Sequence, residues 1–366
     1  MTEAKAKETV FVGLSGGVDS AVSAHLLCEK GYDVVCVFIR GWQPDGLLCP
    51  WQEDRSEALK VAAFLKIPFV SLDCSEEYKK KVVDNFLEQY KRGETPNPDV
   101  LCNKFIKFGF FLEHALKEGA DKIATGHYAR TISKESVLLA RPTDEKKDQT
   151  YFLWTLNQKI LEKTIFPLGK YRKEEVRKIA NKIGLPNADR KDSQGICFLG
   201  DIQMREFLEK YIEKKSGDVV DEKGNTIGSH SGSFFYSLGQ RHGFDIKNKS
   251  PKTEPYFVVE KDFSNNKIVV SNDKFALVRN GATVFLRNVN WISETLPKNK
   301  NVFVRSRHRG LLVNAVLQEV AATTAQAVDK SASTLYTAGQ SLVIYDDKKE
   351  VVLGGGEIDK TLVGEI

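Results

Sequence analysis

The stretch that decides the fold is Val10–Ile39, "VFVGLSGGVDSAVSAHLLCEKGYDVVCVFI". An apolar run breaks at "SGG", and apolar residues then return at helical spacing, with Val22 and Leu26 on one face. Gly31 ends that helix, and a second apolar run follows it. The stretch therefore predicts a strand, a glycine turn, a helix and a second strand.

The same alternation continues outward from this stretch. Apolar strand-like runs at 10–14, 34–39, 68–74 and 122–125 alternate with helical patterns at 22–30, 56–66, 78–90 and 108–117. Strands that alternate with helices form a parallel sheet covered by crossover helices. We expect an α/β fold with an N-terminal parallel-sheet domain.

The pattern changes in the second half of the chain. Helical spacing persists through 173–184 and 202–212, and from about Ser216 short alternating strands with turn signals take over. We expect three domains: residues 1–215 as a nucleotide-binding catalytic domain, 216–275 as a small β-rich central domain, and 276–366 as a C-terminal β-barrel.

Composition restricts the class of protein. The 366 residues are 41% hydrophobic and 28% charged, and no apolar run approaches the roughly 18 residues of a membrane helix. The first nine residues are polar, unlike a secretory signal, so we expect a cytoplasmic protein without membrane contact, and a monomer. The formal charge of +5 permits a nucleic-acid partner without requiring one.

The "SGGVDS" loop has the features of a phosphate site. Free backbone N–H groups and the positive end of a helix dipole face one small space there, and Asp19 could hold Mg²⁺. No lysine follows as in a Walker loop, and no GxGxxG fingerprint occurs. A glycine pair alone is more often a tight turn. The full string resembles the pyrophosphate loop of the ATP pyrophosphatase group, which includes amide-forming synthetases and RNA thiolating enzymes.

Two of the six cysteines have chemically suggestive surroundings. The prolines of "TPNPDVLCNK" and the helical pattern after Asn103 predict that Cys102 lies near a helix N-terminus, where the dipole, Lys104 and Lys107 favour a thiolate. Asp99 would raise the thiol pKa and suits a proton shuttle better. Cys197 lies in a glycine-flanked loop, as an accessible thiol. Three other cysteines are interpreted as small buried hydrophobes: Cys28, Cys36 and Cys74. Cys49 stays undecided.

Seven ordered motifs together resemble the tRNA-specific 2-thiouridylase family of the MnmA type. They are "GLSGGVDS", "TPNPDVLCNK", "ATGHYAR", "KDQTYFLWTL", "FPLGKYRKEEVRKIA", "KDSQGICFLG" and "LGQRHG". The resemblance is dense from about Val10 to Val259. It implies sulfur insertion at C2 of the wobble uridine of tRNA, with ATP, Mg²⁺ and a persulfide supplied by a cysteine desulfurase or a sulfur-relay protein.

The resemblance also implies roles for individual residues. It makes Cys102 the nucleophile, Cys197 the persulfide carrier and Asp99 the acid/base residue. The implied ATP-binding residues are Gly13, Leu14, Ser15, Gly16, Gly17, Val18, Asp19, Ser20, Ile39 and Gly126. The implied base and tRNA contacts are Asn97, Pro98, Asp99, Lys147, Asp148, Gln149, Arg307 and His308.

Some positions depart from the family pattern, and two other functions stay open. Gln194 stands where a small hydroxyl residue is expected, His308 replaces a tyrosine, and the run "GWQPDGLLCPWQ" is less acidic than usual. An ATP-dependent amide synthetase could share the loop, although nothing resembles a glutaminase and that class does not need the two cysteines. A tRNA-binding or sulfur-carrier module without turnover is the other alternative.

Overall fold

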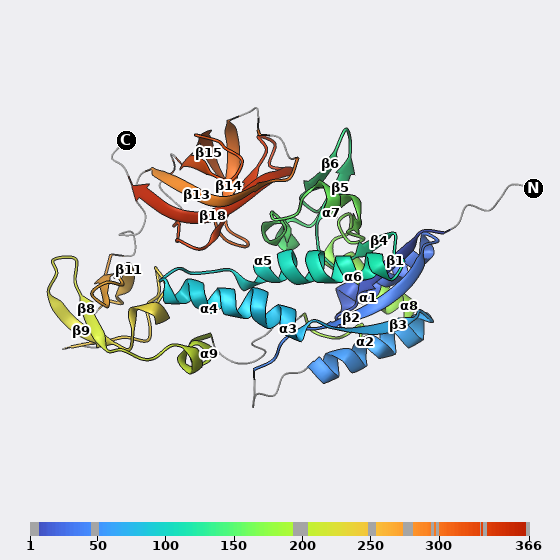
Figure 1. The fold of residues 1–366 in the computed structure, drawn as a ribbon, viewed down its shortest axis with the longest axis horizontal. Coiled ribbons are helices and arrows are strands. Elements are labelled where there is room, and N and C mark those ends of the chain that lie inside the picture. Colours follow the sequence, from blue (N-terminus) through green and yellow to red (C-terminus); the bar gives the residue numbers. More distant parts are fainter. Residues whose placement is uncertain are drawn as a thin grey trace, which may run out of the picture.

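The computed structural model describes residues 7–44, 51–192, 204–247, 254–273, 281–293, 296–297, 300–329, 331 and 335–363. The first sheet is parallel, with strand order β3-β2-β1-β4-β7. Its strands are β1 (Thr9–Gly13), β2 (Asp33–Arg40), β3 (Phe69–Asp73), β4 (Lys122–Ala124) and β7 (Thr164–Ile165). The expected parallel α/β domain is confirmed (Figure 1).

Helices cover both faces of this sheet (Figure 1). Val10 and Val12 face the cluster that holds α1, α2 and α8, whereas Phe11 and Val37 face the cluster of the helices from α3 to α6. Alternate residues of one strand thus enter opposite cores, as a doubly covered strand requires. The helices are α1 (Val18–Glu29), α2 (Trp51–Leu65), α3 (Ser75–Tyr78), α4 (Asp84–Lys91), α5 (Pro98–Cys102), α6 (Phe111–Lys117), α7 (Gln158–Glu162), α8 (Lys173–Ile183) and α9 (Met204–Tyr211).

Two π-helical segments connect neighbouring α-helices without a break. η1 (Lys79–Val83) joins α3 to α4, and η2 (Asn103–Phe110) joins α5 to α6, so each set forms one longer helix. Short 3₁₀ turns lie at η3 (Glu145–Lys147), η4 (Thr150–Phe152) and η5 (Ser233–Phe235). The long helix containing η2 begins at Pro98, so the expectation that it starts after Asn103 is wrong. Pro98 suits the first helical position, and the Asn97 side chain caps the helix by accepting from the backbone N–H groups of residues 99 and 100.

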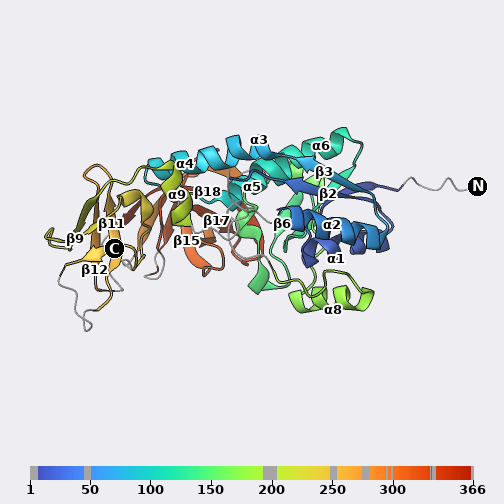
Figure 2. The same cartoon turned by 90° about the horizontal axis from the view of Figure 1, so that it is seen from below.

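A second, five-stranded sheet has the order β10-β9-β8-β12-β11 and lies at one end of the elongated molecule (Figures 1 and 2). Its strands are β8 (Gly217–Val220), β9 (Thr226–His230), β10 (Asp245–Ile246), β11 (Phe257–Asp262) and β12 (Lys267–Ser271). It is the β-rich central part that the turn signals predict. None of the helices in the described residues has the length and hydropathy needed to span a bilayer.

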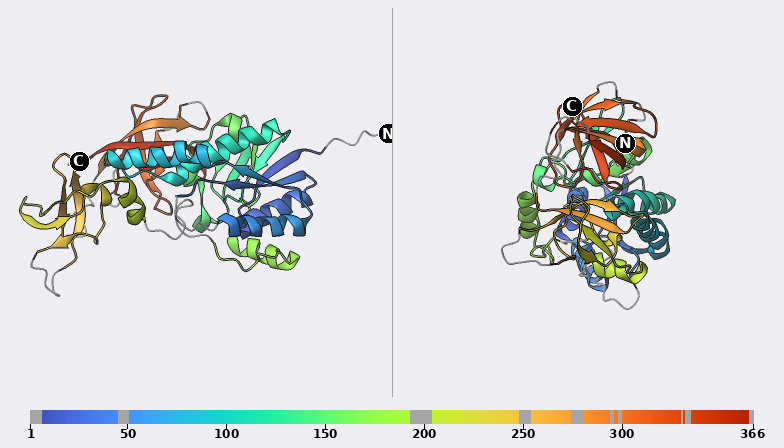
Figure 3. Two further views of the ribbon diagram at one scale, coloured as in Figure 1. Left: turned by 60° about the horizontal axis from the view of Figure 1, so that its bottom comes forward. Right: turned by 90° about the vertical axis from the view of Figure 1, so that its left-hand side faces the viewer.

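The third sheet closes into an antiparallel barrel, because β13 pairs with both β16 and β18. Its strands are β13 (Ala282–Trp291), β14 (Asn301–Arg305), β15 (Val313–Gln318), β16 (Ala325–Asp329), β17 (Ser341–Tyr345) and β18 (Val351–Val363). The predicted C-terminal barrel is therefore confirmed, and Figure 3 shows it beside the long helices.

A hairpin of β5 (Arg130–Ser133) and β6 (Val137–Ala140) extends the barrel sheet from outside. Val351 and Val352 of β18 pair with Ala140 and Leu139 of the hairpin. The pairing joins the N-terminal part of the chain to the barrel, so the segment between β6 and β7 lies where these two parts meet.

Candidate active site and RNA-facing surface

The "SGGVDS" loop lies at the topological switch point of the first sheet. The strand order reverses between β1 and β4, and ligands of open α/β sheets bind outside the carboxyl ends of the strands at such a point. The loop follows β1, and Gly126 follows β4. A Cβ on Gly126 would lie 2.9 Å from the backbone nitrogen of Ser20, so glycine permits this close approach.

The loop is shaped for an anion. Gly16 has φ +80°, a conformation that favours glycine, and no side chain caps the start of α1 among the described residues. The first-turn N–H groups of this 12-residue helix are therefore available to a phosphate. Gly13 lies near Ile39, whose Cδ1 would be 3.8 Å from an added Cβ. The expected nucleotide-pocket residues thus occupy one region.

The helix α1 begins at Val18, four residues before the expected start. Asp19 is consequently a first-turn residue, where the helix dipole favours its negative charge. Its Oδ1 and Oδ2 accept from Nζ of Lys173 at 2.7 and 2.8 Å, and its Oδ1 accepts from the Tyr128 hydroxyl at 3.0 Å. Neither Lys173 nor Tyr128 was singled out from the sequence, although both lie in motifs quoted there.

Asp19 fits a Mg²⁺ that accompanies ATP. No cluster of three or more metal-ligating side chains occurs among the described residues, and Mg²⁺ at phosphate sites commonly takes one or two carboxylates plus phosphate oxygens. The Asp19 side chain is 31% exposed at the loop and can supply one such oxygen. The residues present therefore suit a nucleotide-borne metal rather than an all-protein metal site.

The segment that follows α8 in the sequence covers the SGGVDS loop. The Asn187 side-chain amide and the Arg190 guanidinium donate to the Gly16 carbonyl at 2.8 and 3.1 Å, and Arg190 also pairs with Asp54 at 2.5 Å. These contacts hold residues 187–192 against the loop. Gln194 and Cys197, which follow directly, lie outside the described residues, as does Cys49.

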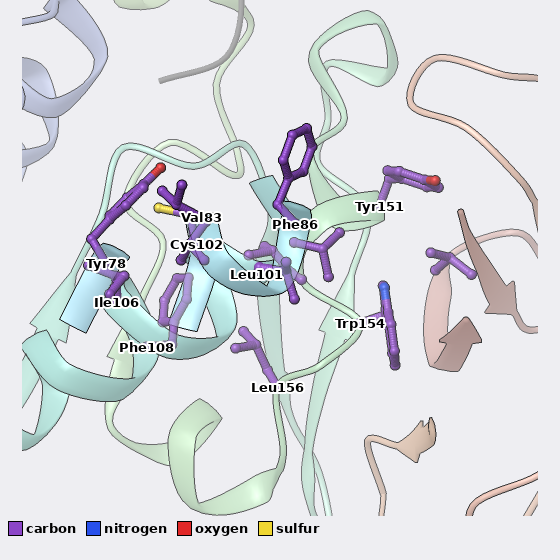
Figure 4. Packing of buried hydrophobic residues seen from close by; sticks show 14 of the residues in the cluster. Tyr78, Val83, Phe86, Leu101, Cys102, Ile106, Phe108, Tyr151, Trp154 and Leu156 are labelled. Carbon is purple, nitrogen blue, oxygen red and sulfur yellow. The ribbon is translucent and has the colours of Figure 1, made fainter. Parts of the chain in front are cut away.

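Cys102 is buried, and its surroundings are shown in Figure 4 among Tyr78, Val83, Ile106 and other apolar neighbours. Burial raises the pKa of the thiol, while Lys107 and a hydrogen bond from Tyr78 oppose the rise. Asp99 raises the pKa further, as the sequence predicts. The thiolate expected at a helix N-terminus is not favoured here, because Cys102 is the fifth helical residue and desolvation outweighs the dipole.

Asp99 lies one helical turn before Cys102, in the first turn of α5. Burial raises the pKa of its carboxyl group above the ordinary value, and Lys107 only partly offsets this. A buried carboxyl group with a raised pKa holds its proton more readily than an exposed one, which suits an acid/base role. The described side chains thus combine a thiol and a candidate acid/base group on one helix.

The other cysteines divide by burial. Cys36 and Cys74 are buried, and desolvation raises the pKa of each thiol to about 12, so their interpretation as inert hydrophobes is confirmed. Cys28 is exposed on α1, and its interpretation as buried is wrong. The helical spacing around Cys28 does not fix which face it occupies.

The residues expected to contact tRNA lie where the N-terminal part meets the barrel. The Lys147 Nζ pairs with Asp192 at 2.8 Å, and the Gln149 side chain accepts from the Tyr128 backbone N–H at 2.8 Å. Arg307 is exposed, and the His308 ring lies 4.6 Å from that of Phe152, centroid to centroid. Burial lowers the pKa of His308, so it is mainly neutral at pH 7.

Asp148 differs from its neighbours because only 2% of its surface is exposed. Its Oδ2 accepts from Arg141 and Arg305 at 2.8 Å each, and its Oδ1 accepts from the Thr150 backbone and hydroxyl. Burial alone would raise the pKa of Asp148, yet these hydrogen bonds and the Arg305 charge lower it. Both oxygens of the Asp148 carboxylate are thus hydrogen-bonded where the N-terminal part meets the barrel.

A basic cleft of about 1190 Å³ opens beside these residues. Among the described residues it is lined by eight cationic and two acidic side chains, so it suits a polyanion. The cations are Arg130, Arg141, Lys146, Lys147, Arg305, Arg309, Lys348 and Lys349, and the acids are Glu145 and Glu350. Leu311, 78% exposed, lies on its lining and offers an apolar contact.

Models of known protein families match three consecutive parts of the chain. Residues 8–201 match the tRNA methyl transferase HUP domain model, 205–272 the tRNA methyl transferase PRC-barrel domain model and 282–358 the aminomethyltransferase beta-barrel domain model. Among solved structures, a U34-tRNA thiolase NcsA from Methanococcus maripaludis with its [4Fe-4S] cluster is 22% identical, covers 56% of this chain and 66% of that chain, and has a TM-score of 0.35.

Curated relatives match over nearly their whole length. The tRNA-specific 2-thiouridylase MnmA of Methylobacillus flagellatus is 41% identical over 97% of this chain and 100% of its own. That of Enterococcus faecalis is 40% identical over 98% of this chain and 97% of its own. The resemblance first seen in seven short motifs is thus confirmed over the full length, and the chain belongs to the tRNA-specific 2-thiouridylase family of the MnmA type.

Proposed function

We propose that this protein replaces the C2 oxygen of the wobble uridine of tRNA by sulfur, with ATP as the activating substrate, in the cytoplasm. The observation that carries the proposal is the anion-binding loop at the sheet switch point in a chain of this family. We propose three domains. Residues 1–215 form the catalytic domain, which carries the nucleotide and sulfur chemistry, residues 216–275 form the small central domain, and residues 276–366 form the C-terminal barrel.

The uridine C2 oxygen is a poor leaving group, so it is first activated. It attacks the α-phosphorus of ATP, the bond to the β-phosphate breaks, and pyrophosphate departs into the loop of Gly13–Ser20. The first-turn N–H groups of α1 stabilise the leaving phosphates. Asp19 would hold the Mg²⁺ that accompanies ATP, and the ion would supply positive charge beside the leaving phosphates.

Sulfur then replaces the adenylated oxygen, and AMP leaves. In one route the Cys102 thiolate attacks Sγ of a Cys197 persulfide and expels hydrosulfide, which adds to C2. In the other, the terminal persulfide sulfur adds to C2, and Cys102 then attacks Sγ of Cys197 to free the thiolated base. Both routes form a Cys102–Cys197 disulfide, which an external thiol must reduce by two electrons. Asp99 exchanges the protons of the base and the thiol.

The excess of cationic side chains in the basic cleft supports this proposal. Lys146, Lys348 and Arg309 have no carboxylate partner among the described residues, so phosphates can approach them without breaking an ion pair. An anticodon loop presents unstacked bases that can leave the stack without opening a helix. We assign the exposed Arg307, together with Lys147, Gln149 and His308, to the tRNA contact, and Asn97, Pro98 and Asp99 to the target base.

The test is a single-turnover assay with ATP, a cysteine desulfurase, cysteine and tRNA. We expect Cys102→Ser and Cys197→Ser each to yield no 2-thiouridine, while adenylation persists: pyrophosphate is still released, and AMP stays bonded to the uridine. Cys28→Ser is the matched control, because that thiol is exposed and outside the site; it should keep full activity. A fully active Cys102→Ser variant would contradict the assignment, and ammonia-dependent pyrophosphate release would indicate an amide synthetase instead.

A further inference from the structure

Asp192 links a lysine of the basic cleft, Lys147, to a lysine beside the nucleotide loop, Lys173. Its Oδ2 accepts from Lys147 Nζ at 2.8 Å, and its Oδ1 accepts from Lys173 Nζ at 2.7 Å and from an Arg177 guanidinium nitrogen at 2.9 Å. One carboxylate thus contacts three cations from two separate parts of the chain. Burial would raise the pKa of Asp192, but the hydrogen bonds from the two lysines lower it, so it is ionised at neutral pH.

The two lysines face different sites. Lys147 lines the basic cleft, whereas Lys173 contacts both carboxylate oxygens of Asp19 at the start of α1. Lys173 is therefore shared between two carboxylates, and only 13% of its side chain is exposed. Arg177 also donates to the carbonyls of Ala188 and Arg190, which anchors the backbone leading to Asp192.

We propose that Asp192 is a positioning residue that divides its charge between these two lysines. It thereby lowers the affinity of the basic cleft for RNA and raises the affinity of the nucleotide loop for Mg·ATP. The inference deepens the proposed function and rests on it. By pairing with Lys147, Asp192 competes with an RNA phosphate. By pairing with Lys173, it weakens the hold of that lysine on Asp19, which leaves Asp19 more accessible to Mg·ATP.

The two effects predict an unusual response to removal of the charge. In Asp192→Asn, Lys147 loses its carboxylate and becomes available to RNA, so RNA binds more tightly. Lys173 then pairs with Asp19 alone, and Mg·ATP must break a stronger ion pair, so nucleotide binds more weakly. A mere loss of one negative charge would instead strengthen the binding of both anionic ligands. A folding defect would weaken both.

The experiment measures two equilibria on the full-length protein by calorimetry. The probes are an anticodon stem-loop RNA with uridine at the wobble position, and Mg²⁺ with α,β-methylene-ATP, which cannot be cleaved at the reacting bond. For Asp192→Asn we expect the RNA Kd to fall about twofold to fivefold and the nucleotide Kd to rise by a similar factor, as partly exposed ion pairs allow. The slope of log K against log salt should steepen by about 0.7, for one added phosphate contact.

Three further variants sharpen the result. Glu145→Gln removes one negative charge from the lining of the basic cleft, but Glu145 pairs with Arg141 and with neither lysine, so this substitution should leave nucleotide binding unchanged. Asp192→Glu should restore wild-type values at least in part. In a Lys147→Met background, Asp192→Asn should no longer tighten RNA binding.

The outcomes separate the inference from the function. If Asp192→Asn shifts both Kd values in the same direction, or neither, the inference is overturned while the proposed function stands. If the wild-type protein binds neither probe, the proposed function falls and the inference falls with it. Opposite shifts that Asp192→Glu reverses would establish the positioning role.

Discussion

At the scale of single residues, the reactivity of Cys102 depends on competing local effects. Burial and Asp99 raise the pKa of its thiol, and Lys107 and Tyr78 lower it. Since only the thiolate is nucleophilic, the free protein holds Cys102 mostly as an unreactive thiol at neutral pH. A buried nucleophile of this kind is protected from adventitious oxidation until the substrates alter its surroundings.

The charges near Cys102 lead to a prediction about its alkylation by iodoacetamide. Below the thiol pKa, the rate should rise about tenfold per pH unit, because it follows the thiolate fraction. Lys107→Met should slow alkylation at pH 8 and Asp99→Asn should speed it, each by roughly threefold to tenfold, because Lys107 lowers the thiol pKa and Asp99 raises it. Mass spectrometry of the peptide carrying Cys102 gives the rate, with exposed Cys28 as an internal control. Equal rates in the three proteins would rule out this electrostatic account.

The residue scale also shows where sequence reasoning ends. Asp19 could be placed at a nucleotide loop, because the order of strand, glycine turn and helix is a local pattern, whereas Gly126 was implied only by the family resemblance. Lys173 could not be placed there by spacing, since 154 residues separate it from Asp19. The resemblance grouped Asp148 with Lys147 and Gln149 as tRNA contacts, whereas its hydrogen-bond partner Arg305 is 157 residues away and could not be found from the sequence.

At the scale of elements, the helix from α5 through η2 to α6 sets the geometry of the proposed sulfur chemistry. Asn97 caps it, Pro98 begins it, and Asp99 and Cys102 project from its first turns. The π-helical segment η2 directly follows Cys102, and such segments are frequent at functional sites. Proline and helical spacing suggested a helix here, but the sequence pattern missed its start because the cap and the proline belong to the helix itself.

We predict that Asn97→Ala destabilises the first turn of this helix by about 1 kcal/mol, the usual worth of an N-cap. The backbone amides of Asp99 and Val100 would lose their acceptor, and their hydrogen exchange should accelerate about fivefold. Asn97→Asp keeps the cap and serves as the control. Exchange that is unchanged in Asn97→Ala would mean that packing, not the cap, fixes this turn.

At the scale of the whole molecule, two sets of contacts connect the barrel to the N-terminal sheet domain, and together they form the joint between these two parts. The β5–β6 hairpin extends the barrel sheet through β18, and Asp148 neutralises Arg141 from one part and Arg305 from the other. The strands of the barrel could be foreseen from alternating sequence, but this joint could not, because it pairs segments about 200 residues apart. The joint also forms one wall of the basic cleft, so it shapes the surface proposed to receive tRNA.

The joint leads to a prediction about Asp148→Asn. The substitution leaves the buried Arg305 guanidinium without a counter-charge and Arg141 with only its pair to the exposed Glu145, and breaking a buried ion pair on one side costs about 3–5 kcal/mol. We expect scanning calorimetry to resolve a separate, earlier unfolding transition for the barrel. Glu145→Gln is the control, since its exposed pair with Arg141 is worth at most about 1 kcal/mol.

The same joint should respond to acid. The folded-state pKa of Asp148 is depressed, so its contribution is fully present above the ordinary carboxyl pKa of 3.8 and is lost as pH falls through the lower, folded value. In the wild-type protein, the barrel transition should therefore separate from the rest only below about pH 4. Asp148→Asn should show the separation at pH 7 and no further dependence on this group. Identical transitions in Asp148→Asn and Glu145→Gln at neutral pH would mean that the hairpin alone holds the two parts together.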